Sequence, residues 1–146
     1  MDDQPTADAG SQGLRVLVSD RQEAALDREA LAELARATLT GEGVTEGELS
    51  ISFVSPEEMA DLHRRYMGEE GPTDVLSFPL GEDGLLGDVV VCPEEALRNN
   101  PEDAPAELRL LVTHGVLHLL GYDHQEDQDR RQMWARQERY SGVRAP

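Results

Sequence analysis

Three of the four histidines lie within eleven residues, in the stretch THGVLHLLGYDH at positions 113–124. His114 and His118 are four residues apart, a spacing that places two side chains on one face of an α-helix. Helical pairs of this kind bind zinc, and a turn at Gly121 would let His124 approach from outside the helix. The spacing therefore predicts one Zn²⁺ per chain, held by His114, His118 and His124, with a fourth coordination position left open as in catalytic sites.

The same spacing occurs in the metzincin proteases, whose pattern is H-E-x-x-H-x-x-G-x-x-H. In those proteases the glutamate after the first histidine is the general base. Gly115 takes that position here, and a glycine has no group that accepts a proton. The sequence therefore keeps the expected metal ligands of a protease and lacks its base.

Hydrophobic periodicity predicts the strands and helices that must position these histidines. Asp27 and Ser55 are expected to cap helices, Gly41 to end one, and Met133 and Trp134 to anchor the last. A Gly/Asp-rich turn at 81–84 is expected to join two strands as a hairpin. Strands are predicted over 14–18, 48–54, 73–80 and 85–92, and helices over 27–39, 55–66, 104–121 and 126–140, with a short one from 93.

Length and composition favour one domain over 14–146, preceded by a disordered acidic leader over 1–13. The leader has neither the basic start nor the apolar stretch of a secretory signal, and Cys92 is the single cysteine. Both features predict a cytoplasmic protein. The net charge of −17 disfavours nucleic acid as a partner on charge alone, although five of the 13 basic residues, all arginines, gather near the C-terminal end.

Three blocks of the sequence resemble the YbeY family of endoribonucleases, which act in ribosomal RNA maturation. They are PTDVLSFP at 72–79, LLGDVVVC at 85–92 and HGVLHLLGYDH at 114–124, in the family's order and at its distances. The resemblance covers roughly residues 14–140. It implies an α/β fold: a small, mostly parallel four-stranded sheet with one antiparallel strand, flanked by about five helices.

The resemblance also implies that the three histidines bind zinc and that the protein hydrolyses single-stranded RNA. The implied role is in maturation of the 3′ end of small-subunit rRNA and in ribosome quality control, with small-subunit ribosomal proteins as partners. Many members carry an RNA-binding arginine after an aromatic residue, where this chain has Met67 after Tyr66. Arg64 and Arg65 are the candidate substitutes, and the neighbouring His63 is interpreted as part of a solvated surface.

The general base of such an enzyme is not assigned by the sequence. Asp123, Asp74 and Ser77 are the candidates, the last two by analogy with the family. Two alternatives stay open: a metal-dependent amidase or protease that shares the histidines, and a non-catalytic ribosome assembly factor in which zinc is structural.

Overall fold

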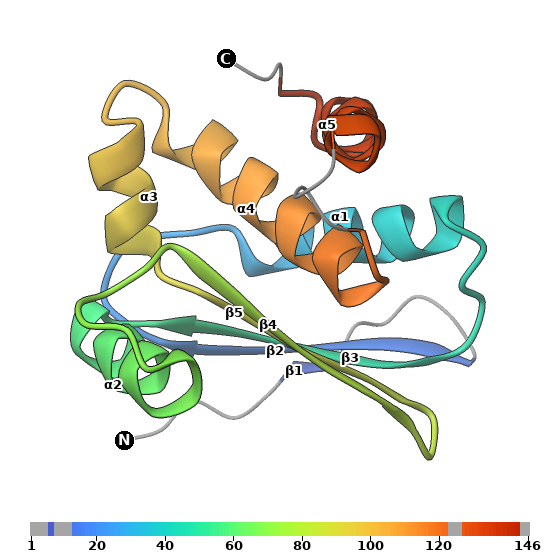
Figure 1. The fold of residues 1–146 in the computed structure, drawn as a ribbon, viewed down its shortest axis with the longest axis horizontal. Helices are drawn as coiled ribbons and strands as arrows, with labels where there is room; N and C mark the ends of the chain where they lie inside the picture. Colours follow the sequence, from blue (N-terminus) through green and yellow to red (C-terminus); the bar gives the residue numbers. More distant parts are fainter. Residues whose placement is uncertain (1–5, 8–12, 123–126, 144–146) are drawn as a thin grey trace.

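The fold is one twisted sheet with helices on both faces, seen in a computed structural model that describes residues 6–7, 13–122 and 127–143 (Figure 1). The strand order is β1-β2-β3-β5-β4. β2, β3 and β5 are parallel, β4 pairs antiparallel with β5, and β1 pairs antiparallel with β2. The strands are β1 (Thr6–Ala7), β2 (Leu14–Arg21), β3 (Gly47–Val54), β4 (Val75–Glu82) and β5 (Leu85–Val91).

The helices divide unequally between the two faces of the sheet. In Figure 1, α1, α3 and α4 lie above the sheet, α2 lies below it, and α5 packs on α1 and α4 as an outer layer. Of the described helices, not one has the length and apolar character needed to cross a membrane. The helices are α1 (Arg28–Gly41), α2 (Pro56–Met67), α3 (Pro93–Asn99), α4 (Ala104–Leu119) and α5 (Asp127–Ser141).

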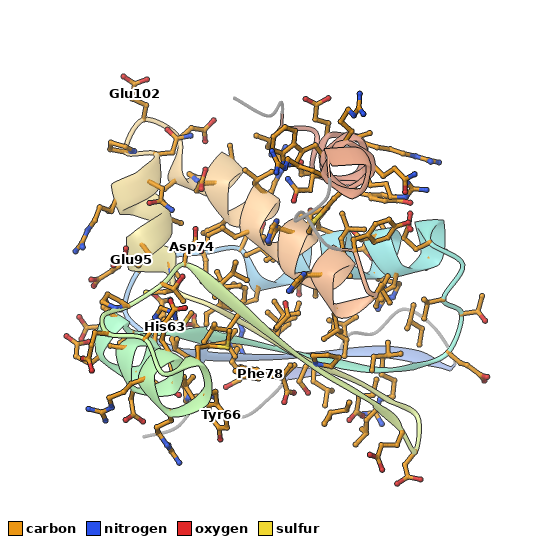
Figure 2. All side chains as sticks on the ribbon, in the orientation of Figure 1. His63, Tyr66, Asp74, Phe78, Glu95 and Glu102 are labelled. Carbon is orange, nitrogen blue, oxygen red and sulfur yellow. The ribbon has the colours of Figure 1, made fainter. Side chains whose placement is uncertain are left out.

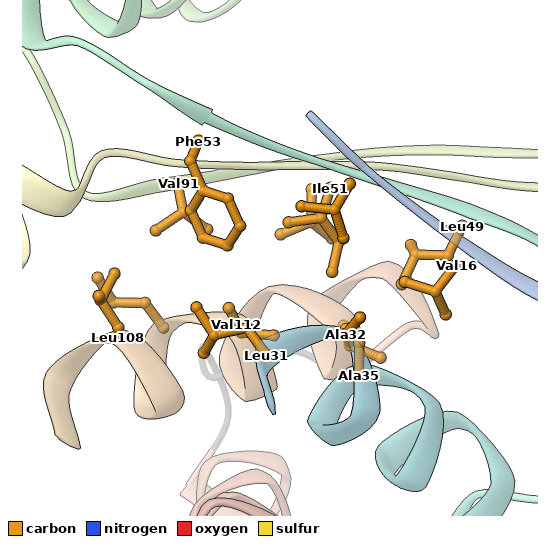
Figure 3. Packing of buried hydrophobic residues seen from close by; sticks show 14 of the residues in the cluster. Val16, Leu31, Ala32, Ala35, Leu49, Ile51, Phe53, Val91, Leu108 and Val112 are labelled. Atoms are coloured by element: carbon orange, nitrogen blue, oxygen red, sulfur yellow. The ribbon is translucent and has the colours of Figure 1, made fainter. Parts of the chain in front are cut away.

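The main hydrophobic core lies between the sheet and the pair α1 and α4. Alternate residues of the strands point into it, and Figure 3 shows Ile51 and Val91 facing the helices. Leu31 and Ala35 of α1 and Val112 of α4 meet them from the other side. This packing fixes α4, the helix that carries the histidine pair, against β5 and the edge strand β4.

A second and smaller core lies on the opposite face of the sheet, under α2. Its buried members include Val90 and Cys92, the alternate neighbours of Val89 and Val91 on the other face. Met59 is the one residue of α2 that is fully buried. α2 is therefore attached to the sheet through a narrow apolar contact.

The structure confirms the predicted fold class, caps and hairpin. The Asp27 side chain accepts a hydrogen bond from the Ala30 amide, and Ser55 Oγ accepts one from the Glu58 amide at 3.2 Å. The strands on either side of the turn at 81–84 pair antiparallel as predicted. The sequence alone therefore predicted these helix caps and this turn correctly.

Three details differ from the expectations. A fifth strand of two residues, β1, adds to the predicted four, because so short a segment has no periodicity to read. Gly41 is the last residue of its helix, as expected, but the left-handed residue is Gly43, and a Cβ at Gly41 would clash with the Tyr140 ring of α5. Met133 is buried as expected, whereas Trp134 is 45% exposed beside Arg130 and does not anchor α5.

Candidate metal centre and substrate groove

The helix that carries the histidine pair has defined ends. Asp103 caps its start by accepting a hydrogen bond from the Ala106 amide. At its end the Gly121 amide donates to His118 O, and the Tyr122 amide donates to Leu117 O. With φ of +106° at Gly121, these bonds form a Schellman motif, which reverses the chain after a helix. The predicted turn at Gly121 is confirmed.

Gly115 lies where α4 meets the sheet most closely. A Cβ at this position would lie 2.6 Å from Val89 Cγ1 and 3.1 Å from Val75 Cγ2. Ser77 Oγ of β4 also donates a hydrogen bond to the Gly115 carbonyl at 2.8 Å. The position that holds the general base in a metzincin therefore points into the sheet here, and its contacts leave no room for a glutamate side chain.

His114 and His118 lie side by side on α4, with ring centroids 6.2 Å apart and the ring planes 19° from parallel. His114 Nδ1 bonds to Gln137 Oε1 of α5 at 2.6 Å, and His118 Nδ1 bonds to the Tyr122 carbonyl at 2.9 Å. Both partner atoms are acceptors, so each ring donates from Nδ1 and carries its lone pair on Nε2. This is the tautomer that binds a metal through Nε2.

The two described histidines thus suit metal binding for two reasons. They share one face of α4, and each Nδ1 is hydrogen-bonded to an oxygen. The third predicted ligand, His124, and the candidate base Asp123 lie outside the described residues. Among the residues that are described, no group of three or more metal-ligating side chains comes together. The complete three-histidine site stays a prediction, of which the structure places two members.

The other two candidate bases lie at different distances from the histidines. Ser77 is beneath α4, where its hydroxyl is committed to the Gly115 carbonyl. Asp74 accepts a hydrogen bond from Asn99 Nδ2 of α3, and its charge helps to raise the pKa of Glu107 after the larger effect of burial. Glu107 precedes His114 by about two helical turns, or roughly 10 Å, so Asp74 belongs to the far end of α4 (Figure 2).

A groove of about 720 Å³ lies on the opposite face of the sheet, beside α2. Its polar floor comes from alternate residues of β2, β3 and β5, and its apolar wall comes from α2 and β4. The sequence signal for it is the alternation of polar residues, Ser19 with Arg21 in β2 and Ser50 with Ser52 in β3, since a polar residue at every second position marks an uncovered face. The lining includes Ser19, Arg21, Ser50, Ser52, Glu58, Tyr66, Phe78 and Asp88.

Two aromatic side chains form one wall of the groove. The Tyr66 ring of α2 and the Phe78 ring of β4 meet edge to face, with centroids 5.3 Å apart (Figure 2). Tyr66 is nevertheless 60% exposed, so most of its surface remains open to a ligand. Arg65 lies 5.8 Å from the Tyr66 ring centre, a cation–π arrangement.

Charged groups inside the groove are largely paired. Arg21 bonds to Glu58 through Nη2 at 2.7 Å and to Ser19 Oγ through Nη1 at 2.8 Å. Burial raises the pKa of Asp88, and a hydrogen bond from Ser50 opposes that rise. The groove is therefore lined by hydrogen-bonding groups with little net positive charge to attract a phosphate.

The residues of α2 that were predicted to bind substrate lie on the groove side of the sheet. Arg64 and Arg65 both bond to Asp61, at 2.9 and 3.3 Å, and their side chains are 61% and 59% exposed. His63 is not part of a solvated surface as interpreted. Its side chain is 13% exposed, with Nδ1 bonded to the Gly71 carbonyl and Nε2 3.1 Å from Glu69. The sequence could not predict these contacts of His63, because both partners, Gly71 and Glu69, lie in the loop that follows α2.

The fold and the site define an α/β protein in which a helix with a pair of histidines packs on a mostly parallel sheet. Comparison with known proteins is consistent with that class. A family model described as endoribonuclease YbeY matches residues 17–142. The solution structure of TM1509 from Thermotoga maritima superposes with a TM-score of 0.60 at 33% identity, over 85% of this chain and 86% of that one.

Curated relatives agree with the family match. Endoribonuclease YbeY of Thermobifida fusca is 48% identical over 126 residues, covering 76% of this chain and 81% of that protein. Its counterpart in Salinispora tropica is 39% identical over 146 residues, covering 86% and 93%. The protein of the same name in Frankia casuarinae is 48% identical, and the match spans 75% of this chain and 63% of that longer protein. This chain belongs to the YbeY family of endoribonucleases.

Proposed function

We propose that this protein is a zinc-dependent endoribonuclease that cuts single-stranded RNA. Its proposed task is maturation of the 3′ end of small-subunit rRNA, together with ribosome quality control. The observation that carries the metal part of the proposal is the fixed tautomer of the histidine pair. His114 and His118 each donate Nδ1–H to an oxygen, which makes Nε2 the metal-binding nitrogen of each ring.

His114, His118 and His124 would hold one zinc ion per chain. Zinc bound there supplies a Lewis acid for a phosphodiester oxygen and lowers the pKa of a bound water. Peptide hydrolysis is disfavoured because the protease base has no counterpart at Gly115, which faces Val89 and Val75 of the sheet.

Asp123 is the candidate that we favour as general base. Ser77 already donates its proton to the Gly115 carbonyl, and Asp74 bonds to Asn99 near the start of α4. We favour Asp123 because it immediately precedes the proposed ligand His124 in the sequence. A carboxylate in that position can accept a proton from water or from a histidine N–H.

Single-stranded RNA suits the groove because bases can enter it while phosphates stay outside. Stacking of a base on an aromatic ring is worth about 1–3 kcal/mol and needs no positive charge, and Tyr66 offers such a face. The exposed Arg64 and Arg65 of α2 would meet phosphates outside the groove. Neighbouring residues of a strand point to opposite faces. In the edge strand β4, Ser77 points toward α4 and Phe78 points into the groove, so the histidine helix and the groove lie on either side of one strand.

The acidic surface bears on how the substrate is delivered. A net charge of −17 repels RNA over distances of about a Debye length, roughly 8 Å at physiological salt. Binding to free RNA is therefore expected to be weak and to depend strongly on salt. Small-subunit ribosomal proteins, which are basic partners in the cytoplasm, would deliver the rRNA to the site.

The test combines metal analysis with cleavage assays on purified wild type, His114→Ala and His118→Ala. Wild type should hold close to one zinc per chain and cut single-stranded RNA, and either variant should lose both properties. His63→Ala is the matched control, because it removes a histidine of α2 that bonds to the Gly71 carbonyl. This variant should retain zinc. A casein assay on the same samples should show no hydrolysis.

Each alternative has its own signature in this experiment. RNA cleavage that continues in a zinc-free His114→Ala protein would remove the metal from the mechanism. Casein hydrolysis by wild type would favour a protease. Zinc binding without RNA cleavage, in a wild-type protein that still binds ribosomes, would favour the assembly-factor alternative.

A further inference from the structure

α5 docks on α4 through polar contacts more than through apolar ones. Met133, Gln137 and Ser141 are its buried residues among those whose side chains are described. Arg109 of α4 donates to the Ser141 carbonyl through Nε at 3.1 Å and through Nη2 at 2.6 Å. Hydrogen bonds have directional geometry, so this docking fixes the position of α5 along α4 more tightly than apolar packing alone.

One of the buried polar residues of α5 reaches the histidine pair. Gln137 is 6% exposed, and its Oε1 accepts the Nδ1–H of His114 at 2.6 Å. A buried amide that lost this partner would be left with an unsatisfied acceptor. The contact therefore holds His114 in one ring orientation and in one tautomer.

A second group of polar residues reaches His118 through the turn after α4. Glu42, just past α1, accepts Tyr122 Oη–H at 2.5 Å on Oε1 and Tyr140 Oη–H at 2.6 Å on Oε2. Arg136 Nε is 3.3 Å from Oε1, and its guanidinium stacks 5.0 Å from the Tyr122 ring centre. Tyr122 is thus held by its side chain while its carbonyl accepts the Nδ1–H of His118.

We propose that Gln137 and Glu42 are positioning residues of the metal centre, Gln137 acting directly on His114 and Glu42 acting on His118 through Tyr122. The inference rests on the proposed zinc function and adds the elements that orient the ligands. It also gives a role to Tyr122, which lies two residues before the proposed ligand His124 in the sequence. Partners that hold ligand histidines typically contribute 10–100-fold to metal affinity.

Gln137 is tested first in the metal-free protein, where zinc cannot impose a tautomer. Nitrogen NMR of the imidazoles should show His114 and His118 protonated on Nδ1 in wild type. In Gln137→Leu, which removes the acceptor, His114 should shift toward the Nε2–H tautomer while His118 stays unchanged. Gln132→Leu makes the same substitution at an exposed position of the same helix and should leave both rings unchanged.

Zinc affinity, measured by competition with a chromophoric chelator, is the second readout. Gln137→Leu should weaken zinc binding by about 10–100-fold, and Gln137→Glu, which restores an acceptor oxygen, should recover most of the loss. Gln132→Leu should bind zinc as wild type does. A purely structural Gln137 would lower the unfolding temperature of the metal-free protein in both Gln137 variants without separating their zinc affinities.

Two tyrosines provide a matched pair for the Glu42 part. Tyr122→Phe and Tyr140→Phe each remove one hydroxyl bond to Glu42, but only Tyr122 also contacts His118. Tyr122→Phe should therefore weaken zinc binding by more than Tyr140→Phe. Glu42→Gln should weaken it at least as much as Tyr122→Phe.

Failure of this inference and failure of the zinc proposal give different results. Wild type that binds no zinc, whatever the tautomers, contradicts the proposed function. Wild type that binds zinc while Gln137→Leu keeps both its affinity and its His114 tautomer overturns the role of Gln137. Equal zinc affinities in Tyr122→Phe and Tyr140→Phe overturn the role of Glu42.

Discussion

The two faces of the sheet are built by different rules. On one face α4 buries eight residues, including Gly115, and the strand side chains that meet it are apolar apart from Ser77, which bonds to the Gly115 carbonyl. On the other face α2 buries Met59 alone, and the strands beside it present Ser50, Ser52 and Asp88 to a groove. The first face is a close-packed interior, and the second is an open groove with one small apolar anchor.

This difference indicates how the work is divided. Ligand histidines must be held within a fraction of an ångström, so they belong on the helix with the most extensive packing. The proposed single-stranded substrate needs an accessible surface with groups that can pair or stack. The edge strand β4 serves both faces, since Ser77 bonds to α4 and Phe78 lines the groove.

A carboxylate placed on each face of the sheet should give the largest difference in stability between the two faces. Gly115→Glu would force a charged side chain between α4 and the sheet, where Val89 Cγ1 is 2.6 Å from even a Cβ. We expect this variant to lose cooperative unfolding and to gain no protease activity, because the new charge would be buried without a partner. Gly115→Ala should cost about 1–3 kcal/mol through overpacking. Circular dichroism during urea denaturation measures both.

Ser52→Glu is the matched change on the groove face. Ser52 is half-buried in the groove floor, so the new carboxylate can reach water. Its cost should be near 1 kcal/mol, the centre of the range for ordinary substitutions. If Ser52→Glu proved as damaging as Gly115→Glu, the groove would be a packed interior and the contrast between the faces would fail.

Truncation of one anchor on each face should give an intermediate effect. Met59→Ala and Leu111→Ala each remove a buried side chain and should each cost about 2–5 kcal/mol. The two variants should differ in how much of the structure opens. After Met59→Ala the α2 amides should exchange hydrogen through a local opening, at a free energy below that of global unfolding. After Leu111→Ala the α4 amides should still exchange only by global unfolding.

Native-state hydrogen exchange at increasing denaturant distinguishes the two cases. Local opening shows exchange that is nearly independent of denaturant, whereas global unfolding depends on it steeply. Equal denaturant dependence for α2 and α4 amides in Met59→Ala would mean that α2 belongs to the same cooperative unit as α4.

The sequence predicted what depends on local chemistry. The caps at Asp27 and Ser55, the hairpin and the turn at Gly121 follow from residues a few positions apart, and the structure confirms them. The His114 and His118 pair was visible for the same reason, since a helix brings residues four apart onto one face. Each pattern was decided by its own short segment of chain.

The features that were missed depend on contacts between distant segments. Gln137 lies 23 residues from His114, and Glu42 lies 80 residues from Tyr122, so no local pattern joins them. Gly41 ends its helix as interpreted, but its lack of a side chain also admits the Tyr140 ring, a contact that no local pattern indicates. Trp134 has the size of a core residue, yet α5 turns it outward because Met133 and Gln137 fill the contact with α4.

The smallest expected effect tests the electrostatics of the groove face. Burial raises the pKa of Asp88 above its usual value of 3.8, so the folded protein binds a proton there more readily than the unfolded chain. The charged carboxylate therefore opposes folding at neutral pH, and this cost disappears as the pH falls through the raised pKa and toward 3.8. Asp88→Asn should stabilise the protein at pH 7 by about 0.5 kcal/mol, at the edge of the usual range for surface changes.

A charge-matched variant separates burial from relief of the net charge of −17. Glu46→Gln removes one negative charge at an exposed position, so any general reduction of repulsion should appear in both variants. Only Asp88→Asn should show a stability gain that shrinks to zero as the pH is lowered from 7 toward 3.8. A gain of equal size and equal pH dependence in Glu46→Gln would assign the effect to net charge, because burial in the groove would then contribute nothing of its own.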